Sequence, residues 1–456
     1  MRSHRVRSSL PPFLSPSLSL VASLLAGGCA ADGVSHADPH ELAADLEREL
    51  AARSQSVAAA RASSDPWDLW LACVETSSPD VIAARRDLAM AEARARVAGA
   101  PTNMLELESV GGGADRETEL MLALDLPGLL GAGRNGAMKA RAEVDTERAR
   151  AQLAAARFRA RHELERRLAA LIVARQLEAD VASLEASSST NAKRLELLRA
   201  RGWLAPDAAA SAETMIHHLG VMRAEQQAAV AAARAGVALA TGLPSDSPFL
   251  DDATNDGATS LLMITQRTWG RGARPDPDSA ALLEAQPDVV LARLDYVAAE
   301  ADLRIACAER WPAIWIGPKA MWTADDLLLG GLLRLELPWS PSAGAAVDAA
   351  RAGREKSRDA LVSALAAARS RIAQRRVEQQ SAERALREHA DDVLVSSEAS
   401  LRAAQARFAV DPGALVEWGM ALDQRVRALT THANELQRWL VATFDLSEAL
   451  GPEARR

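Results

Sequence analysis

Leucine alternates with polar or small residues in two neighbouring stretches of the first half of the chain. A period of two residues is typical of a strand with one apolar face, and the glycine-rich sequence between the stretches is a turn signal. We therefore expect a hairpin over residues 102–127 with one leucine-rich face. The leucines concerned are Leu105, Leu107, Leu120, Leu122 and Leu124.

The same alternation returns in the second half, where a hairpin is expected over residues 312–338. Pro318 in its first strand has no N–H group, which demands an edge position, a bulge or an early strand end. We expect the leucine faces to meet lipid, with tryptophans marking a lipid-water boundary. The predicted membrane-facing residues are Leu105, Leu107, Leu120, Leu122, Leu124, Leu333, Leu335, Trp315 and Trp322.

Apolar residues at spacings of three and four follow each hairpin and predict very long helices. The first is expected from about Gly136 to Leu198, and the second from about Ala345 to Phe408. A helix of about 62 residues is about 93 Å long at 1.5 Å per residue. Each long helix is followed by a turn and by a returning helix of about 36 residues that ends at a glycine, Gly242 or Gly451.

The same elements occur twice in the same order. The helical pattern that begins at Pro79 returns at Pro287, and Leu-Asp-Leu-Pro at 124–127 returns as Leu-Glu-Leu-Pro at 335–338. A nearly constant separation of about 210 residues indicates an internal duplication. The short helix and the returning helix of each copy together nearly match the long helix in length, so we expect them to stack end to end beside it.

The duplication sets the expected domain boundaries. The first repeat covers 66–244, a linker rich in proline, aspartate and glycine covers 245–278, and the second repeat covers 279–452. Each repeat holds a short helix, a hairpin and a long helix pair. The expected fold class is therefore mainly α with a small β part.

The N-terminus resembles a bacterial lipoprotein signal. Within residues 1–28, arginines and an apolar stretch precede Ala-Gly-Gly, and Cys29 follows as the expected site of lipid attachment. A plain cleaved signal without lipid is the alternative. Residues 29–65 would then form an N-terminal linker. By this resemblance the protein is expected at the outer membrane of a Gram-negative bacterium, lipid-anchored, with a periplasmic extension.

Composition excludes several classes of protein. Only 16 aromatic residues among 456 favour helices over a broad sheet core (10 Trp, 5 Phe and 1 Tyr). The net charge of −8, with arginines interleaved among acidic residues, disfavours nucleic acid as a partner. Three cysteines cannot form a disulfide framework. No run of 18 apolar residues is present outside the signal, so any crossing of a membrane must be by strands.

Four strands cannot close into a barrel, and open strand edges are not tolerated in lipid. The chain is therefore expected to oligomerise. The simplest ring with an even number of strands above eight is a homotrimer with twelve strands.

These residues together carry a resemblance to a known family. The duplicated unit, the junction Leu-Asp-Leu-Pro-Gly-Leu-Leu-Gly-Ala-Gly-Arg at 124–134, the turn at 201–207 and the closing Ala-Thr-Gly-Leu-Pro at 240–244 are similar to the outer-membrane efflux protein (TolC-like) family. The heavy-metal (CzcC-like) branch is the most similar. The resemblance implies a trimeric 12-stranded β-barrel and α-helical barrel, docked through a periplasmic adaptor protein on an inner-membrane pump. Such a channel exports small solutes, with heavy-metal cations as candidate cargo, and has no catalytic step.

The resemblance also implies gate residues at the turns. In the family a tyrosine and a glycine precede an acidic residue there. Here Phe408 stands for the tyrosine, Asp411 replaces the glycine, and Glu417 takes the acidic position. In the first copy Asp207 lies one residue before the position at which the family has its acidic residue. A ring of such carboxylates would favour cations at a constriction; the alternative for Glu417 is an ordinary solvated helix residue.

Two other classes of protein are less consistent with the sequence. A lipid-anchored periplasmic coiled-coil adaptor would carry one helical hairpin with flanking β domains, whereas this chain shows two of each element. Gly-Ala-Gly-Arg-Asn-Gly at 131–136 matches a dinucleotide-binding motif, but the helix that follows is too long for that fold. The pair His217 and His218 lacks further metal ligands. No enzyme activity, cofactor or metal is therefore expected.

Overall fold

The computed structural model describes most of the repeats and little of the N-terminus. The chain divides into the units Met1–Gln55 and Ser56–Arg456, and the helices and strands of both repeats belong to the second unit. The predicted signal, Cys29 and most of the two linkers lie outside the described residues. The structure describes residues 45, 48, 52, 55, 66–100, 103–110, 117–125, 133–203, 206–247, 250, 280–310, 313–322, 327–336 and 341–451.

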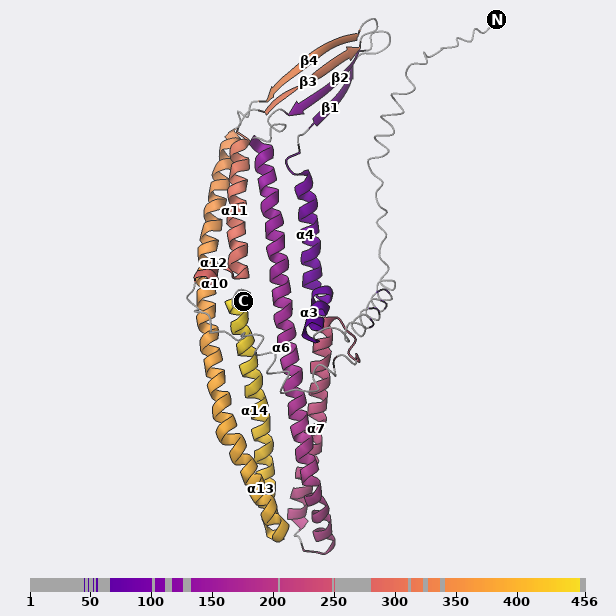
Figure 1. Cartoon of the computed structure of the whole chain (residues 1–456), viewed down its shortest axis with the longest axis vertical. Coiled ribbons are helices and arrows are strands. Elements are labelled where there is room, and N and C mark those ends of the chain that lie inside the picture. The colour runs from indigo at the N-terminus through magenta and orange to yellow at the C-terminus, as the bar shows by residue number, and fades with distance from the viewer. Residues whose placement is uncertain are drawn as a thin grey trace, which may run out of the picture. The chain divides into compact units, whose positions relative to one another are not determined.

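The helices of the first half follow the predicted order (Figure 1). They are α3 (Pro66–Ser77), α4 (Pro79–Val97), α6 (Gly133–Ala200) and α7 (Pro206–Thr241). Proline begins three of them, because the first turn needs no N–H donor and the ring fixes a helical φ. Helix α6 has 68 residues, slightly more than predicted, and is about 100 Å long at 1.5 Å per residue.

The second half repeats this order with one irregularity. Its helices are α10 (Ala280–Glu284), α11 (Pro287–Ala308), α12 (Pro341–Glu388), η3 (His389–Leu394), α13 (Val395–Val410), η4 (Pro412–Ala414) and α14 (Leu415–Leu450). Helices α12 and α13 form the predicted long helix, but the π-helical segment η3 interrupts them. The sequence did not predict this interruption, because residues 389–394 contain neither glycine nor proline.

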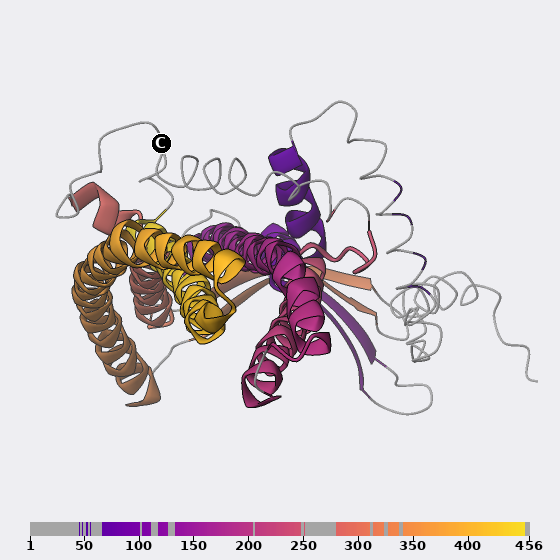
Figure 2. The same ribbon diagram turned by 90° about the horizontal axis from the view of Figure 1, so that it is seen from below.

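Short and returning helices pack beside the long ones. Helices α4 and α7 both pack against α6, and α11 and α14 both pack against α12. The predicted end-to-end arrangement is seen directly in the second half, where Nε2 of Gln286 donates to the carbonyl of Ala449 at 2.5 Å. Viewed from the side of the two turns, α6 with α7 and α13 with α14 form two neighbouring pairs (Figure 2).

The four strands form one antiparallel sheet in the order β1-β2-β3-β4. The strands are β1 (Asn103–Val110), β2 (Glu117–Asp125), β3 (Ala313–Trp322) and β4 (Leu327–Glu336). Both predicted hairpins are present, and the pairing of β2 with β3 joins the strands of the two halves. Because β3 is an inner strand and continues past Pro318, two of the alternatives for this proline, an edge position and an early strand end, are wrong.

A local break in the sheet accommodates the proline instead. The pairs between β2 and β3 stop at Met121 with Lys319 and resume at Leu124 with Ile316. Pro318, between them, has no N–H to donate. A Cβ atom added at the neighbouring Gly317 would lie 1.6 Å from the carbonyl oxygen of Leu122, so only glycine fits there.

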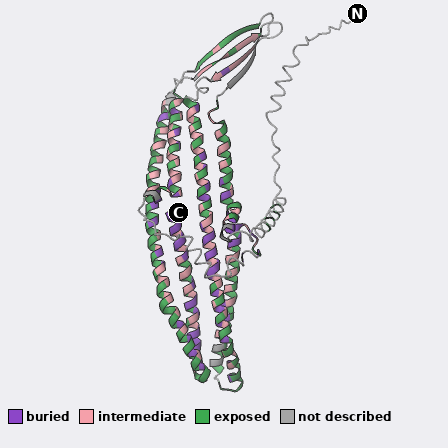
Figure 3. Cartoon of the chain, viewed as in Figure 1, coloured by how far each residue is buried: buried purple, intermediate pink, exposed green. Residues whose placement is uncertain are grey.

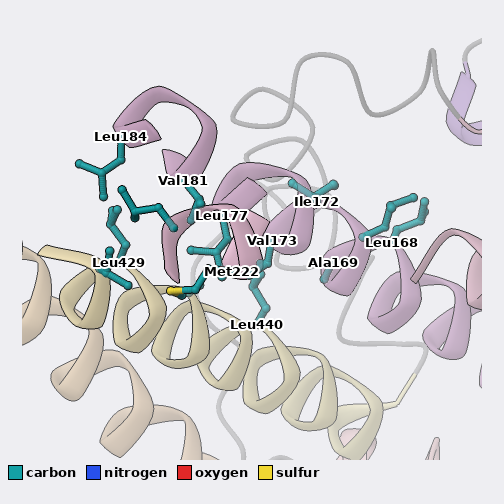
Figure 4. Close-up of a cluster of buried hydrophobic side chains, with 14 of the residues drawn as sticks. Leu168, Ala169, Ile172, Val173, Leu177, Val181, Leu184, Met222, Leu429 and Leu440 are labelled. Atoms are coloured by element: carbon teal, nitrogen blue, oxygen red, sulfur yellow. The ribbon is translucent and has the colours of Figure 1, made fainter. Parts of the chain in front are cut away.

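The main hydrophobic core lies along α6, α7, α13 and α14 (Figure 3). The predicted apolar stripe of α6 is buried in full, and in Figure 4 its residues Leu177 and Val181 lie beside Met222 of α7 and Leu429 of α14. Each leucine buried in this way contributes about 1.5–3 kcal/mol. The buried stripe consists of Leu164, Leu168, Leu171, Leu177, Val181 and Leu184.

Toward the sheet, α6 and α11 are joined by ion pairs. The pairs are Arg134 with Glu309 at 3.2 Å, Arg141 with Asp302 at 2.7 Å, and Arg148 with Asp295 at 2.8 Å. Each arginine follows the last by seven residues while each acid precedes the last by seven, which is the pattern of two antiparallel helices with a heptad repeat. Such exposed pairs are worth about 0.2–1 kcal/mol each, so they fix the register more than the stability.

Candidate functional site

One face of the sheet carries most of the leucine positions of the four described strands. Residues directly opposite each other in an antiparallel pair share a face. Leu105 and Leu107 stand opposite Leu122 and Leu120 in the register, and Ile316 of β3 stands opposite Leu333. The large apolar and alanine positions on this face are Leu105, Leu107, Leu120, Leu122, Leu124, Ile314, Ile316, Ala320, Trp322, Leu327, Leu329, Leu333 and Leu335.

The β4 end of this apolar face is exposed in a single chain. Leu329 is 78% exposed and Leu333 is 75% exposed, and Leu327, Leu335 and Trp322 are exposed as well. Large contiguous apolar patches of this kind mark a surface that is covered by lipid or by another protein. The leucine positions predicted from the alternation therefore fall together on one face.

Trp315 does not belong to the apolar face, and the prediction that groups it with Trp322 is wrong in this respect. The two tryptophans are seven residues apart in one strand, and an odd separation places them on opposite faces. The register sets Trp315 opposite Asp125 and Arg334. The prediction relied on residue type, whereas the period of two decides the face.

The opposite face of the sheet carries charge. Lys319 and Glu119, from β3 and β2, form an ion pair with Nζ and Oε1 2.7 Å apart. Glu119 stands opposite Glu108 in the register, and Glu106 and Glu117 occupy the same face of that hairpin. This face is therefore mostly acidic around the β1–β2 hairpin.

At the second turn, the residue predicted to stand for the family tyrosine is part of the core. Phe408 stacks on Trp418 with ring centroids 5.6 Å apart, and neither side chain is exposed. The Arg194 guanidinium of α6 lies 5.5 Å from the centre of the Phe408 ring. The aromatic pair thus ties α13 to α14, and Arg194 ties both to α6.

Asp411 shapes the turn. Its carboxylate accepts a hydrogen bond from the N–H of Gly413 at 2.8 Å, which caps the short helix η4. Its φ of −116° is an ordinary extended value, so no glycine is needed there. In the first turn Gly202 has a φ of +70°, which does favour glycine.

The carboxylate of Glu417 is exposed at the turn but has a basic partner. Nη1 of Arg407 lies 2.5 Å from Oε1 of Glu417 across the turn. In the first half Arg199 and Glu213 form the corresponding pair, and Asp207 lies in the exposed first turn of α7. Sequence reasoning missed both arginines, because their partners lie on the other side of a turn at no fixed spacing.

The two turns lie close together. Arg194 of α6 donates to the carbonyl of Ala409 at the end of α13. Gly419 of α14 packs so closely against Met215 of α7 that an added Cβ would overlap the methionine sulfur. The charged residues of both turns therefore belong to one end of the helical part.

Other candidate sites find no support among the described residues. No group of three or more histidine, cysteine or acidic side chains there could hold a metal ion, and His217 and His218 are exposed. The described strands are all antiparallel, whereas the dinucleotide fold needs parallel strands. Cys73 is buried and Cys307 is exposed. Of the helices that the structure describes, none combines the length and apolar character needed to span a membrane.

Comparison of this fold with solved structures points to one class of protein. The chain is similar to CusC, in a study of folding and transmembrane channel formation, with a TM-score of 0.71 and 18% identity over 84% of this chain and 91% of that one. It is also similar to a membrane protein of Pseudomonas aeruginosa, with a TM-score of 0.70 and 16% identity over 85% and 93% of the two chains.

The outer-membrane channel MtrE of Neisseria gonorrhoeae matches with a TM-score of 0.66 and 15% identity over 84% and 88% of the two chains. No family model and no curated protein matches the sequence. The chain therefore has the fold of outer-membrane channels. This agrees with the expected fold class, mainly α with a small β part.

Proposed function

We propose that this protein is the outer-membrane channel of a tripartite efflux system, a homotrimer of the TolC-like family. The observation that carries the proposal is a sheet with one leucine-rich face, exposed at β4, attached to helices about 100 Å long, in a chain with the fold of outer-membrane channels. The leucine face would meet lipid and the helices would extend the passage into the periplasm.

Strand length and strand number support a trimer. The strands have 8 to 10 residues, near the 9 to 11 needed to cross a bilayer when tilted. Among the described strands, one chain leaves β1 and β4 as edges without a partner, which lipid does not tolerate. Three chains joined edge to edge make twelve strands and remove every free edge.

Two helical hairpins favour a channel over the adaptor alternative. An adaptor would carry one helical hairpin, whereas this chain has two, α6 with α7 and α13 with α14. The two turns at their ends are the proposed periplasmic mouth, where an adaptor protein and an inner-membrane pump would dock. Acylation of Cys29 would add a lipid anchor to the outer membrane.

The proposed gate residues are Glu417, Asp411 and Asp207. A threefold ring of Glu417 would attract cations, but Arg407 neutralises much of its charge while the ion pair is closed. Asp411 is engaged in capping the turn, so its contribution is structural as well. We propose small solutes as cargo, with heavy-metal cations as the candidate that suits the acidic face of the sheet.

The mass of the assembled particle tests the proposal. The full-length protein, extracted from membranes in detergent, should show three chains by native mass spectrometry. A Cys29→Ala variant separates lipid attachment from assembly, since it should remain trimeric if the sheet closes the ring. A soluble monomer would rule the channel out.

A charged substitution on the leucine face tests whether this face of the sheet meets lipid. Leu333→Asp should reduce membrane insertion, because a carboxylate on the lipid face is costly. Leu239→Asp on α7 is the control, since Leu239 is equally exposed but far from the sheet in sequence. Equal insertion of the two variants would show that the leucine face does not meet lipid.

A further inference from the structure

Two histidines meet where the second long helix is interrupted. His389 is the first residue of the π-helical segment η3, and His432 lies on α14. Their rings stack with centroids 6.1 Å apart and planes 18° apart. Single π-helical turns inside α-helices are rare, and those that occur are frequently at functional sites. The irregular backbone and the histidine pair therefore coincide.

The contacts of the pair suit neutral rings. Nε2 of His389 lies 3.0 Å from the carbonyl oxygen of Ala428, and since a carbonyl only accepts, this nitrogen carries a proton. The Nδ1 atom of His432 is buried and makes no hydrogen bond to any residue that the structure describes. A proton on this Nδ1 atom would have no hydrogen-bond acceptor among the described residues.

Charges on the surrounding helices act on the same group. Burial lowers the pKa of His432, and the neighbouring His389 and Arg425 lower it further, while Asp180 of α6 opposes them. Glu398 of α13 lies 3.5 Å from Arg425, so part of that positive charge is compensated. The net effect of burial and of these charges is a lowered pKa, so His432 is less readily protonated when the helices are packed.

Protons can reach the pair from solvent. A surface cavity of about 260 Å³ lies beside His389, and Asp423 and Arg427 of α14 line it. On the other side, Nη1 of Arg425 donates to the carbonyl of Leu394 at 2.8 Å, which fixes the end of η3 to α14. The histidine contact and the arginine contact thus hold the two ends of η3.

We propose that His389 and His432 form a proton-sensitive joint that holds η3 against α14 near neutral pH and releases it on acidification. A released His432 returns to its ordinary pKa of 6.5, so the released form binds more protons than the packed form. The packed form is therefore fully stable above about pH 6.5 and loses stability as the pH falls from there toward the lowered pKa.

Release would act on the end of the molecule with the two turns. From η3 to Asp411 is about 22 residues, or about 33 Å of helix. If η3 is released from α14, helix α13 would move Arg407 away from Glu417 and so break their ion pair. The inference that the joint regulates a gate rests on the proposed function, whereas the joint itself does not.

Hydrogen exchange of the full-length protein in detergent tests the joint. After correction for the intrinsic effect of pH, exchange of the amides over 389–398 should rise about threefold or more between about pH 7.5 and about pH 5.5. His432→Phe keeps a stacked ring without a titratable nitrogen and should abolish the rise. The double variant His217→Gln, His218→Gln, at an exposed pair on α7, should keep it.

Two results would overturn the joint: no rise in the unmodified protein, or an undiminished rise in His432→Phe. If His432→Phe exchanges fast at every pH, NMR titration of the His432 imidazole in the unmodified protein decides, because the pKa of His432 must lie below its ordinary value of 6.5. A pKa of His432 that is not lowered would also refute the proposal. Trimer mass reports separately on the channel, so the two proposals can fail independently.

Discussion

Replacing Asp445 by asparagine would remove a carboxylate that joins three helices. On α14, Asp445 accepts from Nε and Nη2 of Arg166 of α6 at 3.1 and 2.7 Å. Its other oxygen lies 2.9 Å from Nη1 of Arg375 of α12. The Asp445 side chain is only 13% exposed, so water replaces these contacts poorly. The carboxylate therefore links the long helices of both halves.

The structure sets the size of the expected effect. Hydrogen bonds to charged groups contribute about 1.5–3 kcal/mol when little exposed, and the partly exposed arginines reduce this. Burial lowers the pKa of Arg166, but Glu448 and Asp445 outweigh that effect and raise it, so the guanidinium stays charged. We expect Asp445→Asn to lower the free energy of unfolding by about 1–3 kcal/mol. Asp302→Asn, at the exposed α6–α11 pairs, should cost less than about 1 kcal/mol.

Urea unfolding of the detergent-solubilised protein, followed by far-ultraviolet circular dichroism, measures the difference. A double-mutant cycle of Asp445→Asn with Arg375→Gln should give a coupling energy of about 1 kcal/mol. Equal costs for Asp445→Asn and Asp302→Asn, or a coupling energy near zero, would refute the argument that burial makes this cluster stronger than the exposed pairs.

Further substitutions test the sheet, the core and the turns. Gly317→Ala should prevent trimer assembly while the helical circular dichroism signal remains, because its Cβ would overlap the Leu122 carbonyl. The control Gly330→Ala has open space around its Cβ and should assemble. Equal assembly of the two variants would contradict this reasoning. Leu440→Ala should cost about 2–5 kcal/mol in urea unfolding, since the side chain is fully buried, and a cost below about 1 kcal/mol would be inconsistent with the packing. In planar bilayers Glu417→Gln should reduce cation selectivity and Arg407→Gln should increase it; opposite or absent changes would exclude the pair from the gate.

Periodic features of the fold could be predicted from the sequence. The α6 stripe from Leu164 to Leu184 is buried as its spacing predicts, because a helix of this length must place such residues on one side. Likewise the alternation in β2 and β4 predicts a shared apolar face. The end-to-end stacking followed from length alone. The buried stripe and the apolar face depend on residue spacing within one element, and the stacking depends on helix length.

Features that depend on contacts between elements could not be predicted in the same way. The interruption at η3 has no breaker residue, and Arg407 and Arg199 find their partners across turns of unequal length. Trp315 was misplaced because residue type does not decide the face of a strand, whereas position in the register does. The ion pairs between α6 and α11 do have a signal in the sequence, since Arg134, Arg141 and Arg148 are spaced by seven, but that spacing alone names no partner helix.

The pairing of β2 with β3 has a genetic consequence. It leaves β1 and β4 as the two edges of the described sheet, one from each half of the chain, so in the proposed ring each subunit gives one edge to each neighbour. One subunit with a damaged edge strand would leave the ring open even if the other two subunits were intact. In a cell that makes defective and intact chains equally, only about one assembly in eight would be whole, so such alleles should be dominant.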